Sequence, residues 1–453
     1  MNSNLRNPAS RRLSYIGALF LAALAALISI PRDLAFAQNH SASGARMSTK
    51  APAKQKDNSD SKFIYFFDAA GDFIKIGMPS ETEVAHGQIA AAQEVAAAHP
   101  NFDGCILCDI HTSPSTHLLY AVIANGGPAS GDQANNYRIV ALEDSQLKQI
   151  ASSGPSEPPA DAYAILITPD GKQMLASYQA SSPDQSANQS TDQLTFALSI
   201  YDLSSLKQLK TLHEETTTAA FTAGTPVNLS FTKQAYFGPQ RKIYDRFDTI
   251  AYDEQKLSKS TFDPFELLAG SPSKQLQAYA SPATNGGRPY FAVDYADATS
   301  GKILVTLNAG KSGPEALLAI DAQTHTLSPP IPFPQLTVHT IHLTPDAGQV
   351  LVEEFTWRKN PSAGSESSPD IDRTGRYFVF DTSSGKELHQ FATKELLGFQ
   401  PAFLCISPDG ELAFYTLNHG LYSLDLRTGS VTRIHANAGF RFDKWTLFAF
   451  AGN

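Results

Sequence analysis

Several residue types that would point to a particular class of protein are scarce in this 453-residue chain. It has three cysteines, too few for a small domain held by disulfides, so its stability must come from ordinary burial of apolar side chains. Charged residues make up 17%, the formal net charge is −9 and no basic run occurs, which argues against nucleic acid or an anionic membrane as a partner. No nucleophile-elbow, phosphate-loop, dinucleotide-binding or His-Glu-x-x-His motif occurs, so the sequence predicts no catalytic residue, cofactor or metal ligand.

Long hydrophobic runs are also scarce, and the one at residues 15–30 is shorter than the roughly 20 residues of a membrane-spanning helix. Arg6, Arg11 and Arg12 precede this run, and Ala35-Phe36-Ala37 follows it with the small-x-small pattern of a cleavage site. The pattern predicts a signal peptide over residues 1–37, cut between Ala37 and Gln38. We therefore expect a periplasmic or secreted protein with no membrane span in the mature chain. Cleavage would remove four arginines and one aspartate and change the formal charge from −9 to −12.

Residues 38–61 are rich in Ser, Ala, Lys and Asp and show no apolar periodicity. Such a segment cannot bury enough surface to offset the entropy lost on ordering, so we expect a disordered leader. The folded region is then residues 62–453.

A repeat dominates that region. Seven times a short run of β-branched and aromatic residues ends in an acid and is followed by a turn and a second run. The spacing is about 60 residues, which is typical of propeller blades or solenoids. The acids that end the runs are Asp68, Glu143, Asp202, Asp253, Asp321, Asp381 and Asp425.

A second motif precedes these hairpins, with an apolar residue, Ser or Thr, and then Pro-Asp, at residues 167–172, 343–346 and 406–410. Proline presets the first corner of a turn, and each copy is followed by a further apolar run. One repeat therefore predicts four antiparallel strands: A, a Pro-Asp turn, B, a loop, C ending in the acid, a turn, and D. The clearest copy is residues 402–434.

The two ends of the folded region complete each other. The first hairpin, residues 63–76, is interpreted as strands C and D, and residues 439–450 as strands A and B. Together they predict an all-β, seven-bladed propeller whose ring is closed by an N-terminal C–D hairpin and C-terminal A–B strands, which removes exposed sheet edges.

The pattern resembles the YVTN-type and WD-repeat-like (WD40-like) propellers of secreted bacterial proteins, over residues 62–453. The matching residues of the best repeat are Ser407-Pro408-Asp409-Gly410, and Leu424-Asp425 through Thr428-Gly429. The chain departs from true WD repeats because Trp357 precedes Arg358 and Trp445 precedes Thr446. The resemblance implies an architecture and carries no chemistry.

Two kinds of insertion depart from the minimal blade. Three predicted B–C connections are long and polar, at residues 124–136, 179–193 and 358–375, and would emerge on one face. They are interpreted either as solvated insertions or as a rim that binds a partner. Ser80-Glu-Thr-Glu83 has the pattern of a capping box before an Ala-rich stretch, which predicts a short helix near residues 80–98.

Cys105 and Cys108 form the most suggestive local cluster, with His111 three residues later. Haem attachment would require His directly after the second Cys, where Asp109 stands, and zinc would require a second ligand pair. In an oxidising compartment a Cys105–Cys108 disulfide could form. In a regular strand, residues three apart face opposite sides and would stay two buried thiols. Both alternatives stay open.

The leading hypothesis is an exported, non-catalytic binding or protein-interaction propeller. Its partner would be a protein, a small molecule or a glycan held by loops 124–136, 179–193 and 358–375. The alternative is a hydrolase resembling the bacterial lactonase propellers, with a metal site at the channel mouth. For that alternative, His111, His339 and His342 are the imidazoles that could face the channel, although packing is the simpler interpretation of His339 and His342.

Overall fold

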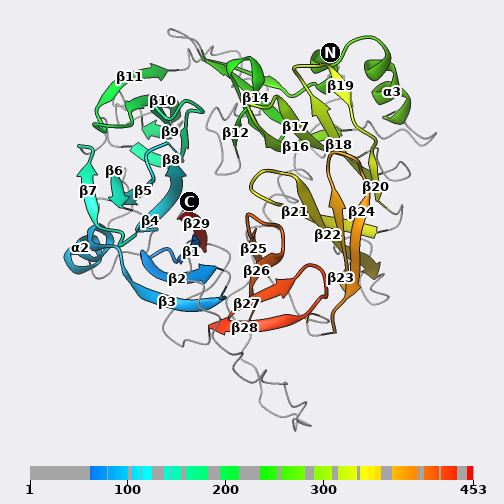
Figure 1. Ribbon diagram of the computed structural model, residues 1–453. Coiled ribbons are helices and arrows are strands. Elements are labelled where there is room, and N and C mark those ends of the chain that lie inside the picture. The colour runs from blue at the N-terminus through cyan, green and yellow to red at the C-terminus, as the bar shows by residue number, and fades with distance from the viewer. Residues whose placement is uncertain are drawn as a thin grey trace, which may run out of the picture. The chain divides into compact units, whose positions relative to one another are not determined.

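The computed structural model confirms the seven-bladed propeller (Figure 1). It describes residues 62–78, 80–99, 105–113, 115–124, 137–143, 145–154, 160–181, 194–213, 235–252, 257–280, 290–308, 315–333, 337–358, 370–394, 396, 402–417, 420–435 and 446–451. The predicted signal peptide, its cleavage site and the predicted leader lie outside these residues and stay predictions. No helix in the described part of the chain is long and apolar enough to cross a membrane.

Each blade is an antiparallel sheet whose strands run outward from the central channel in the order A to D. Blade 1 contains β29 (Leu447–Ala451), β1 (Lys62–Phe67), β2 (Asp72–Met78) and β3 (Thr82–Gln88). Blade 2 contains β4 (Leu107–Ser113), β5 (Leu118–Ala124), β6 (Tyr137–Glu143) and β7 (Gln149–Ser152). Blade 3 contains β8 (Ala160–Ile167), β9 (Gln173–Ser181), β10 (Leu194–Asp202) and β11 (Gln208–His213). Blade 4 contains β12 (Tyr236–Phe237), β13 (Lys242–Asp245), β14 (Asp248–Tyr252) and β15 (Leu257–Thr261).

In blade 5, β16 (Tyr290–Ala296), β17 (Lys302–Asn308) and β18 (Glu315–Asp321) are followed by two short strands that both pair with β18, β19 (Thr326–Leu327) and β20 (Ile331–Phe333). Blade 6 contains β21 (Thr337–Leu343), β22 (Gln349–Arg358), β23 (Asp370–Asp381) and β24 (Glu387–Ala392). Blade 7 contains β25 (Ala402–Ile406), β26 (Leu412–Leu417), β27 (Gly420–Asp425) and β28 (Val431–His435). The short helices are η3 (Pro239–Arg241), η4 (Pro264–Leu267), α2 (Ala90–Ala98) and α3 (Ser271–Tyr279).

In the described part of the chain, the buried apolar residues form seven clusters, one between each pair of neighbouring blades. Strand β1 shows how one sequence serves two of them. Tyr65 and Phe67 pack toward blade 2, whereas Ile64 and Phe66 pack toward blade 7. Because side chains alternate along a strand, a strand buried on both faces must be apolar at every position. This is why the hydrophobic runs of the repeat are continuous.

Ring closure is confirmed, but the division of strands between the two ends differs from the prediction. The N-terminal segment supplies strands B, C and D of blade 1, and β29 alone supplies strand A, which pairs with β1 (Figure 1). Asp68 therefore ends strand B, whereas Asp202, Asp321, Asp381 and Asp425 end strand C. Residues 439–445 and Asp253 lie outside the described residues. The error arose because Asp68 makes the same kind of turn, accepting hydrogen bonds from Ala70 N and Asp72 N, at the opposite end of the blade.

The predicted helix near residues 80–98 is correct only in its second half. Residues Thr82–Gln88 form β3, the exposed outer strand of blade 1, and α2 begins at Ala90. The capping-box pattern was misleading, because Ser80 Oγ hydrogen-bonds Gly77 O and Thr82 Oγ1 within the turn that precedes β3.

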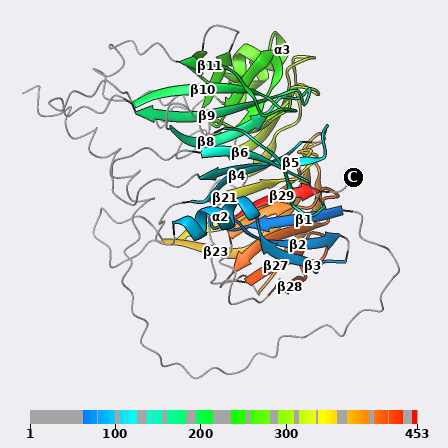
Figure 2. The same cartoon turned by 90° about the vertical axis from the view of Figure 1, so that its left-hand side faces the viewer.

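Helix α2 packs against the seam between blades 1 and 2 through Ala91, Ala92 and Val95 (Figure 2). A Cβ on Gly71, at φ 84°, would collide with Ala92, so the helix rests directly on the β1–β2 turn. It is therefore part of the core.

The Pro-Asp turns recur with one geometry. In all three, the Ser or Thr hydroxyl donates a hydrogen bond to the carboxylate of the Asp two residues later. The same hydroxyl accepts a hydrogen bond from the backbone N–H of the first residue of strand B. The C–D turns use their acids in a related way. Hydrogen bonds from Ser204 and Ser205 lower the pKa of Asp202 to about 2, and those from Ser384 and Ser383 lower the pKa of Asp381 to about 2. These acids are turn formers, as predicted.

Candidate functional site

Two cavities formed by residues of the described part of the chain lie along the inner strands of the blades. The first, here the Pro408 cavity, has a volume of about 730 Å³ and is lined at the A–B end of the blades by His117, Pro345, Pro408 and Asp409. The second, here the Asp294 cavity, has a volume of about 850 Å³ and reaches the B–C end through Arg246, Phe247 and Tyr290. The two cavities share Tyr236, Pro345, Phe448 and Phe450.

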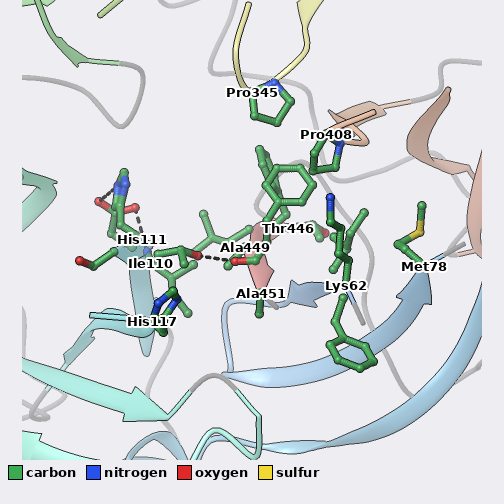
Figure 3. Close-up of a pocket in the computed structure, with 18 of the residues that line it drawn as sticks. Lys62, Met78, Ile110, His111, His117, Pro345, Pro408, Thr446, Ala449 and Ala451 are labelled. Atoms are coloured by element: carbon green, nitrogen blue, oxygen red, sulfur yellow. Dashed lines mark hydrogen bonds and ion pairs between the residues drawn. The ribbon is translucent and has the colours of Figure 1, made fainter. Parts of the chain in front are cut away.

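His111 faces the Pro408 cavity from β4, and its Nε2 lies 3.3 Å from Oδ2 of Asp109 (Figure 3). Asp109 is almost fully buried. Its Oδ1 accepts the N–H of Ile110, and its Oδ2 accepts the N–H of Ile165 on β8. The carboxylate thus links blade 2 to blade 3 in addition to contacting the imidazole.

The two predicted cysteines of this region do not line the Pro408 cavity. Cys105 Sγ donates a hydrogen bond to Leu107 O, and Cys108 Sγ donates one to Cys105 O. Cys108 is the extra residue of a β-bulge in β4, a distortion that the sequence does not show. The disulfide stays a prediction.

The Asp294 cavity is built by the inner strands of blades 4 to 7 and blade 1, together with the β13–β14 turn. Asp294 is the extra residue of a bulge in β16, between Val293 and Tyr295, and a bulge re-aims the side chain that it carries. Oδ2 of Asp294 accepts hydrogen bonds from Oγ1 and N of Thr306, at 2.6 and 3.0 Å. The rings of Tyr236 and Tyr295 lie 5.4 Å apart beside it.

Desolvation dominates the electrostatics of this carboxylate. It raises the pKa of Asp294 to about 6, although the hydrogen bonds from Thr306 and the charge of Arg246 act in the opposite direction. Desolvation and the nearby charge of Asp294 raise the pKa of Tyr236 to about 12. Within the described part of the chain, no basic nitrogen comes within ion-pair distance of Asp294.

Exposed aromatic rings gather on the same cavity. Tyr290, Phe247 and Phe448 are 49%, 40% and 37% exposed, and all three line it. The rings of Phe247 and Tyr290 meet edge to face at 5.9 Å. The other large exposed apolar side chains among the described residues stand singly on the outer strands of four different blades: Val84, Ile150, Leu209 and Leu388. The aromatic grouping is therefore a local feature of the cavity.

His342 also lines the Asp294 cavity, with its ring 4.6 Å from that of Phe403. This fits its interpretation as a packing and channel residue. His339 lies in β21, but its side chain is outside the described residues. Among the described residues, no group of three or more His, Cys, Asp or Glu side chains is arranged to hold a metal ion.

No sequence motif identifies Asp109 or Asp294, but the sequence around both acids carries a signal. Both acids lie inside an apolar inner strand, in Leu-Cys-Asp-Ile and Val-Asp-Tyr. The acids of the repeat, by contrast, stand at the ends of their strands. A carboxylate inside a mostly buried strand is unfavourable unless hydrogen bonds or a positive charge stabilise it. An acid at such a position is therefore a candidate site residue.

No family model and no curated protein matches this sequence. Among solved structures, the chain is similar to the Cps50 (Swd1) β-propeller domain of Myceliophteria thermophila at 12% identity, with 73% of this chain and 87% of that one covered and a TM-score of 0.36. It is also similar to Kuenenia stuttgartiensis hydrazine synthase at 10% identity, with 79% and 71% covered and a TM-score of 0.30. The propeller itself rests on the strand order and register of this chain.

Replacing Asp294 with Asn is expected to stabilise the protein at pH 8 by up to about 3 kcal/mol and by well under 1 kcal/mol at pH 4. The pKa of this acid is raised from 3.8 to about 6. Above pH 6 the folded state therefore contains a buried negative charge that water would solvate in the unfolded state, and this lowers the free energy of unfolding. As the pH falls through 6, Asp294 takes up a proton in the folded state before it does so in the unfolded state. The difference in stability between the wild type and Asp294→Asn then disappears. Urea unfolding at both pH values measures it.

Asp297→Asn is the matched control on the same blade. Desolvation alone would raise the pKa of Asp297, but hydrogen bonds from Ser300 and Thr299 outweigh it and lower that pKa. This variant should therefore lose stability at pH 8. If both variants changed stability by the same amount and in the same direction, the result would contradict the assignment of a raised pKa to Asp294 and a lowered pKa to Asp297.

Proposed function

We propose that this chain is an exported binding propeller that takes its ligand in the Asp294 cavity. The observation that carries the proposal is the gathering of Phe247, Tyr290 and Phe448 on one cavity beside a carboxylate. Solvent-exposed aromatic rings that cluster around a concave site with a few polar groups are typical of ligand-binding surfaces. A carboxylate whose burial opposes its ionisation supports a functional role, because its charge does not serve stability.

The cavity mouth lies at the end of the blades from which the three long B–C connections leave. The strands that flank these connections, β5 and β6, β9 and β10, and β22 and β23, are the B and C strands of their blades, as predicted. The predicted bounds were too wide, because β9 extends to Ser181 and β23 begins at Asp370, so residues 179–181 and 370–375 belong to strands. The residues between them lie outside the described part of the chain, and their role in holding a partner stays a proposal. The shared end of the blades favours one ligand-binding face.

A binding panel tests the function. Small molecules that raise the melting temperature of the full chain should lose that effect in a Phe247→Ala, Tyr290→Ala double variant. A ligand that binds the folded state adds about 2.7 kcal/mol at a hundredfold excess over its dissociation constant, which is readily measured. The matched control is Ile150→Ala, Leu388→Ala, which removes two exposed apolar side chains from outer strands. Hits that survive in the cavity variant, or a panel with no hits, would refute the proposal.

Export is tested separately. The N-terminal charge, the hydrophobic run and the Ala35-Phe36-Ala37 pattern support cleavage before Gln38. The intact mass of the chain recovered from a bacterial periplasm should correspond to residues 38–453. Recovery of an uncleaved chain from the cytoplasm would overturn this part of the proposal.

A second candidate function is hydrolysis, and the Asp109–His111 pair favours it. A carboxylate that orients an imidazole at a cavity is the arrangement of a general base. The predicted lactonase-like activity would then be centred on the Pro408 cavity.

A further inference from the structure

The charges and rings of the Asp294 cavity indicate the class of ligand. We propose that this cavity binds an organic cation, an amine or guanidine attached to an apolar ring or chain, with Asp294 as its counter-charge. This inference rests on the proposed function of the cavity as a ligand site.

The carboxylate is the first argument. Both hydrogen bonds to Asp294 come from Thr306 and reach the same oxygen, Oδ2. A carboxylate oxygen can accept further hydrogen bonds, and an ionised carboxylate in a desolvated site is stabilised by a cation at contact distance. Within the described residues no cationic side chain takes that position. A bound ammonium group would supply the missing charge.

The aromatic rings are the second argument. Tyr236 and Tyr295 flank the carboxylate, and Phe247, Tyr290 and Phe448 line the more exposed part of the cavity. Aromatic faces such as those of Tyr236 and Tyr295 attract cations, and the apolar surface of Phe247, Tyr290 and Phe448 accommodates the hydrocarbon part of the ligand. At about 850 Å³ the cavity is large enough for a drug-sized molecule.

Among the described residues that line the cavity, Arg246 is the only positive side chain, and its position explains why it does not neutralise Asp294. Its guanidinium carbon lies 5.0 Å from the centre of the Phe247 ring, so the ring already engages it. Its charge acts on Asp294 only from beyond ion-pair distance, and more weakly than desolvation does. Arg246 should therefore weaken the binding of a cation, which makes it a useful second variant.

A charge series on one ring tests the inference. Benzylamine, benzyl alcohol and benzoate carry a positive, zero and negative charge beside the same phenyl group, and their binding to the full chain can be measured by ligand-observed NMR at pH 7.5. Benzylamine should bind about tenfold more tightly than the other two. Asp294→Asn should remove that preference, whereas Arg246→Gln should strengthen it. The matched control is Glu266→Gln, which removes an exposed acid of blade 4 outside the cavity.

The outcomes separate this inference from the proposed function. Equal binding of all three probes, abolished by Phe247→Ala with Tyr290→Ala, would keep the cavity as a ligand site and refute the cation. Tightest binding of benzoate, lost in Arg246→Gln, would identify an anion site and also refute it. Binding of no probe in the wild type, together with no hit from the panel, would reject both proposals. A preference for benzylamine that survives in Asp294→Asn would assign the site elsewhere.

Discussion

Removing residues 447–453, which include β29 (Leu447–Ala451), is expected to abolish cooperative folding of the propeller. Strand β29 is the only segment of the described chain that completes blade 1 on the channel side, and it pairs with β1 over five residue pairs. Ladder hydrogen bonds contribute about 1 kcal/mol each, so their loss alone amounts to several kcal/mol. The whole stability of a domain is about 5–15 kcal/mol.

Packing adds to this loss. Ala449 and Ala451 are buried in the cluster between blades 1 and 2, and the carbonyl of Phe450 accepts a hydrogen bond of 2.8 Å from Thr112 Oγ1 on β4. Without β29, the strand β1 becomes an unpaired apolar edge, which promotes aggregation. Thermal melting by circular dichroism and size-exclusion chromatography should show no cooperative transition and a soluble aggregate. Deleting only residues 452–453 is the control and should melt as the full chain does.

The repeat was predictable because the middle strands of each blade are buried on both faces. A strand between two seams, such as β5 or β26, requires an apolar residue at nearly every position, and this produces runs that differ visibly from the polar turns between them. Outer strands carry no such signal. In β3 only part of one face is covered, so Thr82–Gln88 is polar, and local propensity then favoured a helix.

The phase of the first blade could not be predicted for a related reason. An acid followed by a tight turn can accept hydrogen bonds from nearby backbone N–H groups at either end of a blade, as Asp68 and Asp425 both show. Only the pairing of β29 with β1 distinguishes the two assignments, and this pairing joins residues that are far apart in the sequence. Both candidate sites depend on the same kind of information, because the cavities assemble from single residues on several blades.

Replacing Asp109 with Ala is expected to destabilise the protein by about 2–5 kcal/mol. The carboxylate accepts the backbone N–H groups of Ile110 and Ile165, and both donors would be left buried without an acceptor. An unsatisfied buried donor costs about 1–3 kcal/mol. Asp109→Asn should lose nearly as much, because an amide offers one oxygen and directs its NH₂ group at the second donor. Urea unfolding at pH 7.5 measures both variants, and a loss below 1 kcal/mol in each would contradict the link between blades.

His111→Gln is the companion variant, expected to change stability by less than about 1 kcal/mol. Its imidazole is partly exposed, lies 3.3 Å from the carboxylate and satisfies neither backbone donor. The difference matters for function, because a loss of activity in an Asp109 variant would follow from unfolding alone. His111→Gln keeps the fold and removes the imidazole, so lactone turnover that the wild type shows and this variant lacks would place a general base in the Pro408 cavity. Turnover unchanged in His111→Gln would instead assign the Asp109–His111 pair to the seam between blades 2 and 3.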